Sequence, residues 1–213
     1  MSTAQGRPRD HWVDIVATVL LAIGTVATAW SGYQASRWNG EQATTAGRAN
    51  ADRIESTRAS ALADAQTEVD VATFSQWVDA YARGETELTD FYRRRFRPEF
   101  APAVTAWIAT RPLKNPDAPL TPFVMPEYHL AARDEAARLE AAANAGAARV
   151  RVDVQRSTNY VLAVVLFSAT LFFAGMSMKM PSPRLRLALL AVGLTLFTGT
   201  VIWIATSPVS VSV

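Results

Sequence analysis

The chain contains no cysteine and very little histidine or lysine. Without cysteine, its 213 residues can form no disulfide, thiolate metal site or cysteine nucleophile. The two histidines, His11 and His129, lie far apart and lack the spacing of metal ligands, so we expect no metal centre. Only Lys114 and Lys179 are lysines, against 19 arginines, and alanine is abundant. This bias indicates a GC-rich bacterial genome.

Charged residues are almost absent from three long apolar runs. The runs are Trp12–Trp30, Tyr160–Met178 and Leu187–Thr206, and Asp14 is the only charged residue in any of them. A hydrocarbon core about 30 Å thick is crossed by roughly 20 apolar helical residues. The sequence therefore predicts an integral membrane protein with three transmembrane helices. Because Asp14 lies near the start of the first run, we expect it in the headgroup region rather than in an intramembrane ion site.

The loop between the second and third runs indicates the orientation. Residues 179–186 contain three basic side chains and no acidic one, which predicts that this loop faces the cytoplasm. The N-terminal tail, residues 1–11 with Arg7 and Arg9, would then also be cytoplasmic. The insert and the C-terminal tail, residues 207–213, would lie outside an inner (plasma) membrane. The opposite orientation stays open, because four arginines of the insert lie close to the runs: Arg37, Arg149, Arg151 and Arg156.

The insert, residues 31–159, is polar and close to neutral. Between Arg37 and Arg156 it contains 16 basic and 17 acidic residues, so the insert is mixed in sign, whereas a nucleic-acid binder normally shows a clustered basic footprint. Its two ends, residues 31–83 and 127–156, lack proline and are rich in alanine. They predict an antiparallel helical stalk and an all-α fold. A helix over residues 31–83 would be about 80 Å long and one over residues 128–156 about 44 Å.

The longer arm must therefore bend, break or extend past its partner. We expect bends at Gly32, Gly40 and Gly47, since glycine weakens helices. Between the arms, residues 84–126 predict a small helical tip with short helices over Glu85–Phe96 and Ala101–Thr110. The proline-rich stretch that follows cannot form a regular helix. We expect an extended loop anchored by its apolar residues: Leu120, Phe123, Val124 and Met125.

The densest motif in the tip is the segment from Phe91 to Phe100. It interleaves four arginines with four aromatic residues, and arginine is well suited to binding phosphate, lipid headgroups or an acidic peptide. The candidate ligand-binding or partner-binding residues are Arg93, Arg94, Arg95 and Arg97. The alternative is structural: the arginines pair with nearby acids while the aromatics pack the tip. Those acids are Glu85, Glu87, Asp90 and Glu99.

The third apolar run contains small and hydroxylated residues near its middle. Small residues let membrane helices approach and hydroxyls bond across them, which favours close helix packing here. The residues are Gly193, Thr195, Thr198, Gly199 and Thr200, and the leading candidates are Thr195, Thr198 and Gly199. The same side chains could instead line a pore. In the first alternative this helix packs against another helix, and in the second it faces a pore.

The chain has one span, then a helical insert, and then a two-span hairpin. The motif Trp30-Ser31-Gly32-Tyr33-Gln34-Ala35 marks the membrane exit of the first span. In these features the chain resembles uncharacterised bacterial membrane proteins of a domain-of-unknown-function family, and the resemblance implies no activity. The arrangement of spans is also similar to the proton-channel subunits that energise outer-membrane transport. That resemblance implies a cytoplasmic insert.

No nucleophile–base pair, phosphate-cradling glycine loop or paired-carboxylate motif stands out in the sequence. We therefore expect a non-enzymatic bacterial membrane protein without a cofactor. The leading hypothesis is a homo-oligomeric scaffold or sensor whose helical insert binds a protein or envelope partner. The alternative is a channel or transport subunit with the third span lining a pore.

Overall fold

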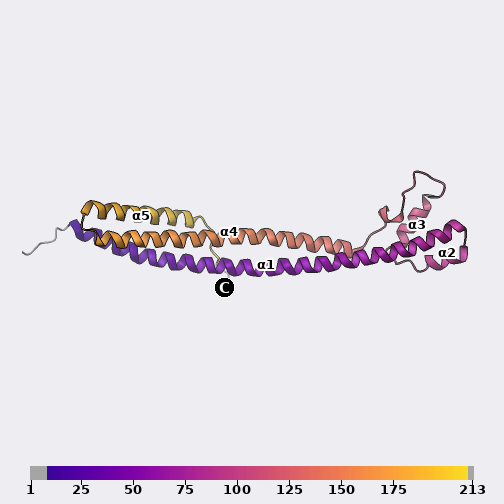
Figure 1. Ribbon diagram of the computed structural model, residues 1–213, viewed down its shortest axis with the longest axis horizontal. Helices are drawn as coiled ribbons and strands as arrows, with labels where there is room; N and C mark the ends of the chain where they lie inside the picture. Colours follow the sequence, from indigo (N-terminus) through magenta and orange to yellow (C-terminus); the bar gives the residue numbers. More distant parts are fainter. Residues whose placement is uncertain (1–8, 211–213) are drawn as a thin grey trace, which may run out of the picture. The chain divides into compact units, whose positions relative to one another are not determined.

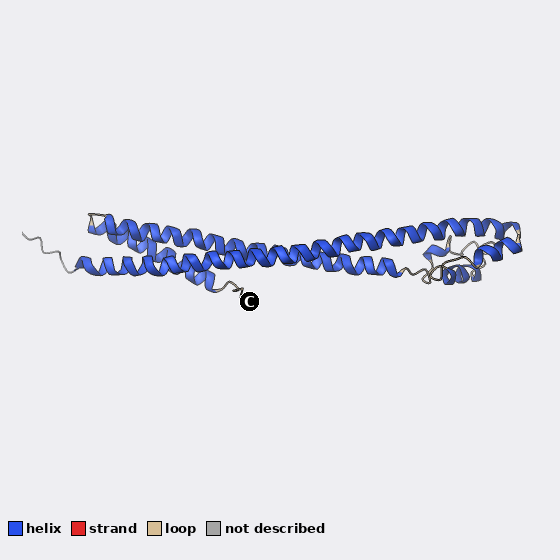
Figure 2. Cartoon of the chain, turned by 90° about the horizontal axis from the view of Figure 1, so that it is seen from below, coloured by secondary structure: helices blue, strands red, loops and turns tan. Residues whose placement is uncertain are grey.

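The computed structural model describes residues 9–210, with side chains from residue 11 onward. Arg7 of the predicted cytoplasmic tail and the last three residues of the C-terminal tail lie outside the described residues. Within residues 9–210 the regular structure is entirely helical, with no strand (Figure 2). This confirms the predicted all-α fold.

Five α-helices and one short 3-10 helix follow one another along the described chain (Figure 1). Three of the α-helices contain a stretch long and apolar enough to cross a membrane, as predicted for a membrane protein. These are α1 (Arg9–Arg83), α4 (Ala131–Lys179) and α5 (Pro183–Ala205). The short helices are α2 (Thr86–Arg93), α3 (Ala101–Ala109) and η1 (Pro122–Val124).

Helix α1 runs without interruption through the glycines at which bends were expected. Gly32, Gly40 and Gly47 all have helical backbone. A glycine costs about 1 kcal/mol relative to alanine in a helix, which is too little to break a helix that packs along its length. The chain divides into two compact units. We call residues 9–47 and 146–210 the membrane unit and residues 48–145 the tip unit.

In the membrane unit, α1 and α4 pack antiparallel along seams of regularly spaced residues. A Cβ added at Gly24 would meet Leu171, and one at Gly32 would meet Val164, so residue numbers fall on one helix as they rise on the other. Buried α1 residues recur every seven positions, the spacing that keeps one helix face against a partner. They are Ala17, Gly24, Ser31 and Trp38. The buried α4 residues alternate in steps of three and four: Tyr160, Ala163, Phe167, Thr170, Ala174 and Ser177.

Polar contacts join the helices of the membrane unit at several levels. Asp14 forms an ion pair with Arg186 at the start of α5, so the one acidic residue of the first apolar run is neutralised within the chain. Ser157 Oγ donates to the carbonyl of Ala35 at 3.1 Å and lies 2.9 Å from Asn39 Oδ1. Such bonds satisfy buried polar groups that lipid could not.

Residues beyond α5 return to the α1–α4 pair. The Tyr160 hydroxyl donates to the Pro208 carbonyl at 3.1 Å. The amide group of Gln34, which is fully buried, accepts a hydrogen bond from the backbone N–H of Ser210 at 3.0 Å. The end of the described chain is therefore fixed by side chains from both long helices.

In the tip unit, the rest of α1 carries a second heptad seam. Ser56 Oγ donates to the carbonyl of Ala136 at 2.9 Å, and Arg53 Nη2 donates to Asn144 Oδ1 at 3.1 Å. These two pairs show that α1 and α4 are antiparallel here too, as predicted. The seam residues of α1 are all buried: Ala49, Ser56, Ala63, Asp70 and Trp77.

The extra length of α1 is covered by the tip. Helix α4 begins only at Ala131, and the last turns of α1 pack instead against α2, α3 and η1. This aromatic core supplies apolar burial that the alanine-rich stalk lacks, at about 25 cal/mol per Å². Its buried members are Phe74, Trp77, Phe96, Phe100, Val104 and Trp107. The two predicted short helices are confirmed as α2 and α3; α3 starts at Ala101 as predicted, and the other three ends are shifted by one to three residues.

The proline-rich loop is anchored by only two of the four residues expected to hold it. Phe123 and Met125 pack against the aromatic core, and the Phe123 ring stacks on Phe100 with centroids 4.9 Å apart. Leu120 is 93% exposed and Val124 is 68% exposed, so the prediction was wrong for these two. The loop is held instead through its backbone, because Trp107 Nε1 donates to the Pro119 carbonyl at 2.6 Å.

Candidate functional site: the arginine-rich tip

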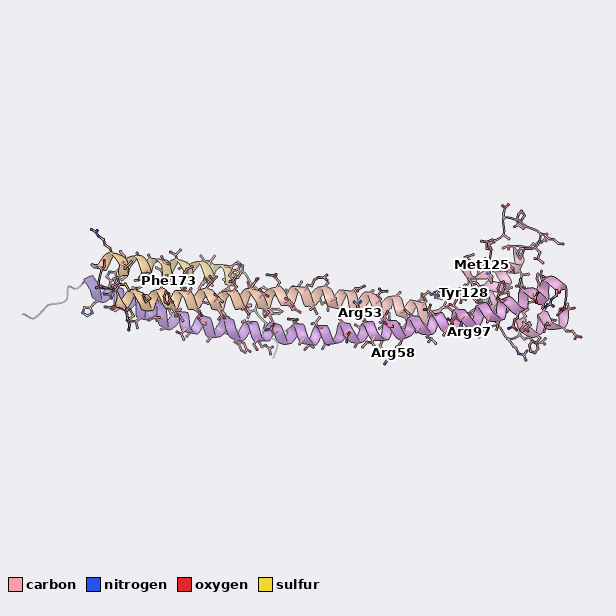
Figure 3. The ribbon with its side chains drawn as sticks, viewed as in Figure 1. Arg53, Arg58, Arg97, Met125, Tyr128 and Phe173 are labelled. Atoms are coloured by element: carbon pink, nitrogen blue, oxygen red, sulfur yellow. The ribbon has the colours of Figure 1, made fainter. Side chains whose placement is uncertain are left out.

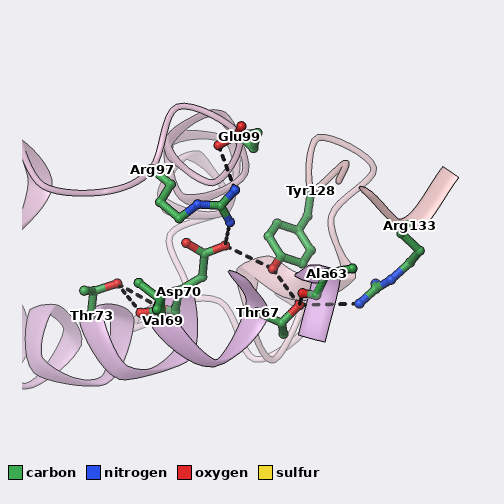
Figure 4. Close-up of polar contacts among 9 residues, drawn as sticks. All are labelled: Ala63, Thr67, Val69, Asp70, Thr73, Arg97, Glu99, Tyr128 and Arg133. Carbon is green, nitrogen blue, oxygen red and sulfur yellow. Dashed lines mark hydrogen bonds and ion pairs between the residues drawn. The ribbon is translucent and has the colours of Figure 1, made fainter. Parts of the chain in front are cut away.

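A buried ion pair lies at the base of the tip. The Asp70 side chain on α1 is fully buried, and Arg97 Nη1 lies 3.0 Å from its Oδ2 atom (Figure 4). Arg97 Nη2 also lies 3.1 Å from Glu99 Oε2. The Arg97 side chain is 20% exposed. This arginine therefore ties the turn between α2 and α3 to the α1 seam.

Tyr128 brings the segment before α4 to the same carboxylate. Its hydroxyl donates to Asp70 Oδ2 at 3.1 Å and lies 3.3 Å from Thr67 Oγ1. Arg133 of α4 donates to the same Thr67 oxygen at 3.4 Å. Figure 3 shows Arg97, Tyr128 and Met125 gathered in the tip. The turn between α2 and α3 and the segment before α4 thus meet at the Asp70 carboxylate of α1, and α4 joins the network through Thr67.

Burial dominates the electrostatics of this network. It raises the pKa of Asp70 above its ordinary value, while the Arg97 guanidinium and the Tyr128 hydrogen bond act in the opposite direction. Burial also raises the pKa of Tyr128.

Asp70 Oδ1 has no hydrogen-bond partner within the described part of the chain. No group of three or more metal-ligating side chains lies there or elsewhere in residues 9–210. The network therefore holds the segments of the tip together.

The other three arginines of the motif lie at the exposed end of α2. Arg95 places its guanidinium 3.5 Å from the centroid of the Phe91 ring and donates to the Phe91 carbonyl at 3.2 Å. Arg93 and Arg94 are exposed and have no ion-pair partner within residues 9–210. We call Arg93, Arg94 and Arg95 the cationic ridge. Three adjacent positive charges therefore face solvent.

The structural alternative for this motif holds in part. Among the four acids proposed as partners, Glu99 pairs with a motif arginine, while Glu85 pairs with Arg83 at 3.5 Å. Phe96 and Phe100 are buried in the aromatic core, and Tyr92 packs against it. Phe91 stays 39% exposed beneath Arg95. Arg97 thus has a structural role, whereas the ridge is open to solvent.

Sequence reasoning missed Asp70, the central residue of this network. Arg97 and Asp70 are 27 residues apart, so no local spacing rule connects them. A signal was present, because Asp70 falls on the seven-residue seam that continues to Trp77. A charged residue at a seam position requires a buried partner.

The third-span candidates lie on the outer side of α5 within the membrane unit. Thr195, Thr198 and Gly199 are exposed, whereas the buried residues of α5 are Leu190, Gly193 and Thr200. A Cβ added at Gly193 would lie 3.5 Å from the Thr170 carbonyl oxygen and from Phe173 Cβ. Within one chain, α5 therefore packs through Leu190 and through Gly193 and Thr200, two of the five small or hydroxylated residues expected at a helix interface. Thr195 and Gly199 line a shallow hollow of about 240 Å³ together with Leu166, Leu196, Thr200 and Trp203.

No family model matches this chain, and neither the curated proteins nor the solved structures contain a match to it. The resemblance in the exit motif after the first span therefore stays a prediction.

Proposed function

We propose that the chain is a non-enzymatic protein of a bacterial inner membrane that uses its tip unit to bind an acidic protein or envelope partner. The observation that carries this proposal is the cationic ridge of Arg93, Arg94 and Arg95. Like charges at adjacent positions repel one another, and here no acidic side chain of the described chain forms an ion pair with Arg93 or Arg94. A partner with clustered negative charge would neutralise the ridge, and arginine forks bind carboxylates and phosphates in two-point geometry.

The support beneath the ridge favours recognition over a purely solvating surface. Helix α2 leads directly into Phe96 and Arg97, which are fixed by the aromatic core and by Asp70. A surface held by such a core loses little conformational freedom on binding, which favours affinity. The ridge also lies at the C-terminal end of α2, where positive charge stabilises the helix. Stabilisation of the helix end accounts for one cation in the last turn, but it accounts less well for three consecutive cations.

Charge reversal on the ridge tests this function. A photo-crosslinking amino acid at the exposed Leu88, in the full chain expressed in bacterial cells, should capture a partner. Capture should be lost in an Arg93→Glu/Arg94→Glu double variant. Arg58→Glu is the matched control, because Arg58 is also exposed on the tip unit but lies on α1 beside Glu55. A crosslink that survives the ridge reversal would reject the ridge as the binding surface.

A second candidate function is a channel or transport subunit that assembles through α5 as a homo-oligomer. The threonines at positions 18, 25, 28, 170 and 200 each donate to the carbonyl four residues earlier. The hydroxyls of Thr195 and Thr198 have no hydrogen-bond partner within residues 9–210, although both are exposed on an apolar helix. A hydroxyl in hydrocarbon without a partner is costly. A neighbouring copy of the chain or a water-filled pore would supply the missing partner.

Ion flux distinguishes the two candidates. In liposomes containing the purified chain, flux that disappears in a Thr195→Leu/Thr198→Leu variant would support the channel. Thr18→Leu serves as the control, because its hydroxyl is already bonded within α1. If the same variant instead converts an oligomer to a monomer with no flux in either form, α5 is an assembly interface. A wild-type chain that is monomeric and does not conduct contradicts both roles for α5.

A further inference from the structure

The tip unit contains a small hollow that is separate from the cationic ridge. It has a volume of about 250 Å³ and is lined by Tyr81 of α1, Ile108 of α3, and Arg111, Leu113 and Lys114 of the segment that follows. Three lining residues are apolar or aromatic, and two are cations. This combination of an apolar wall with a few charged groups is typical of small-molecule sites.

Arg111 has an unusual backbone for a non-glycine residue. Its φ angle is +56°, the only positive φ of a non-glycine residue within residues 9–210. Its N–H bonds to the Ile108 carbonyl at 2.9 Å, so Arg111 ends α3 at the position where glycine is usually found. Pro112 follows, and a residue before proline normally prefers extended backbone. Arginine is thus present where glycine would fit with less strain, and such strain is often found at functional sites.

The backbone of this turn brings the two cations to the same hollow. The Arg111 carbonyl accepts hydrogen bonds from the N–H groups of Lys114 at 2.8 Å and Asn115 at 2.9 Å. Neither the Arg111 nor the Lys114 side chain has an ion-pair partner within the described residues. Two unneutralised positive charges are therefore held by one tight turn beside an apolar wall.

We propose that this hollow binds a phosphate monoester that carries a small apolar group. A phosphate monoester has a charge of about −1.5 to −2 at pH 7, which matches two cations better than a single carboxylate does. The Arg111 guanidinium and the Lys114 ammonium would bind the phosphate oxygens. Tyr81, Ile108 and Leu113 would pack against the apolar group. The hollow is smaller than the ~300–1,000 Å³ typical of sites for drug-sized ligands, so the bound group is small.

The test uses phenyl phosphate as the probe and the full chain in a neutral detergent. Isothermal titration calorimetry should give one site per chain, with inorganic phosphate binding more weakly and benzyl alcohol giving no measurable binding. Lys114→Gln and Arg111→Gly should each weaken phenyl phosphate binding at least about tenfold, the loss expected for a charged hydrogen bond. Arg58→Gln, an exposed arginine on the same unit outside the hollow, should leave the affinity unchanged.

Hydrogen exchange separates lost binding from lost folding. Because glycine accepts a positive φ without strain, Arg111→Gly should leave amide exchange over residues 101–110 unchanged or slower while binding is lost. Lost binding together with intact protection supports the site. Affinity that survives both Arg111→Gly and Lys114→Gln overturns it, as does binding of benzyl alcohol equal to that of phenyl phosphate. Both variants leave the cationic ridge intact, so this failure would not affect the proposed function.

A second arm identifies the source of the phosphate. The titration is repeated with the chain in phosphatidylcholine nanodiscs, to which separate empty nanodiscs with or without phosphatidic acid are added. Competition by phosphatidic acid indicates that the hollow binds a lipid headgroup. Unchanged affinity for phenyl phosphate indicates a soluble phosphate ester. Absence of phenyl phosphate binding in detergent and in nanodiscs overturns the proposal.

Discussion

Arg97 places its guanidinium 3.0 Å from the carboxylate of Asp70, a residue 27 positions earlier that lies fully buried in the α1 seam. This contact joins the turn between α2 and α3 to the long helix on which the tip is built. Because one partner is buried and the other is mostly covered, the pair is screened little by water. Its main effect is to fix the position of the tip segments, including the residues next to the cationic ridge.

Removing the arginine of this pair should destabilise the tip. Arg97→Gln leaves the buried Asp70 carboxylate without its cation, and such losses typically cost about 3 kcal/mol or more. The cost can be measured as the opening free energy of amides over residues 96–108 by hydrogen exchange of the full chain. Arg94→Gln, an exposed neighbour, should change it by less than about 0.5 kcal/mol. Equal effects of the two variants would show that the Asp70 contact contributes nothing.

The stability of the tip should depend on pH through the titration of Asp70. Burial raises its folded-state pKa above the ordinary 3.8, so the folded tip binds a proton more tightly than the unfolded chain does. The contribution of Asp70 is therefore fully present below about pH 3.8 and is lost as pH rises through the folded-state pKa. Opening free energies of the tip amides, measured across this range, should fall less steeply in Asp70→Asn. Identical slopes in the wild type and in Asp70→Asn would show that Asp70 does not cause this pH dependence.

Tyr128 should make the tip sensitive to alkaline pH. Burial raises its pKa above 10.0, so its contribution to stability is present below pH 10 and is lost as pH rises through the higher folded-state value. In Tyr128→Phe the hydroxyl no longer titrates, and the alkaline loss of tip protection should be smaller. Far-ultraviolet circular dichroism combined with hydrogen exchange above pH 10 measures this. A variant that loses protection as steeply as the wild type would exclude Tyr128 as the cause.

Gly193 and Gly199 should respond differently to enlargement. Gly193 is buried against α4, and an added Cβ would make ordinary contacts near 3.5 Å, so Gly193→Ala should be tolerated. Gly193→Leu should instead force α5 away from the Thr170 backbone. Gly199→Leu is the matched control, because nothing within 4 Å would meet an added Cβ there. The melting temperature in detergent should fall for Gly193→Leu alone. A fall with Gly199→Leu accompanied by loss of oligomer would place α5 in an interface between copies.

Sidedness can be tested with single cysteines, because the native chain has none. We expect the tip to lie outside the inner membrane and the basic loop before α5 to lie inside. Leu120 is 93% exposed, and Ser182 is also exposed, so Leu120→Cys and Ser182→Cys report on the two sides. A membrane-impermeant thiol reagent should label the first in intact cells and the second only after lysis. The reverse pattern would place the tip in the cytoplasm and favour the channel-subunit alternative.

The sequence by itself determined the coarse architecture. Three runs of about 20 apolar residues can be satisfied only as helices in a membrane, and the proline-free, alanine-rich arms favour helix wherever they pack. Helix-breaking residues then located the tip, since Gly84 has a φ of +75° and the prolines follow soon after. These are local properties, and each can be read from consecutive residues.

Only the tertiary structure decided which polar residues are buried. The α1 seam in the tip unit runs through Ala49, Ser56, Ala63 and Asp70, and small or polar side chains at seven-residue spacing carry little hydrophobic pattern. The pairing of Arg97 with Asp70 and the meeting of Arg111 with Tyr81 join residues about 30 positions apart. In the same way, Leu120 and Phe123 are both apolar, but only Phe123 reaches the core. Which residues pair and which are buried depends on the surfaces that come together in space. Residue type and spacing along the chain do not specify those surfaces.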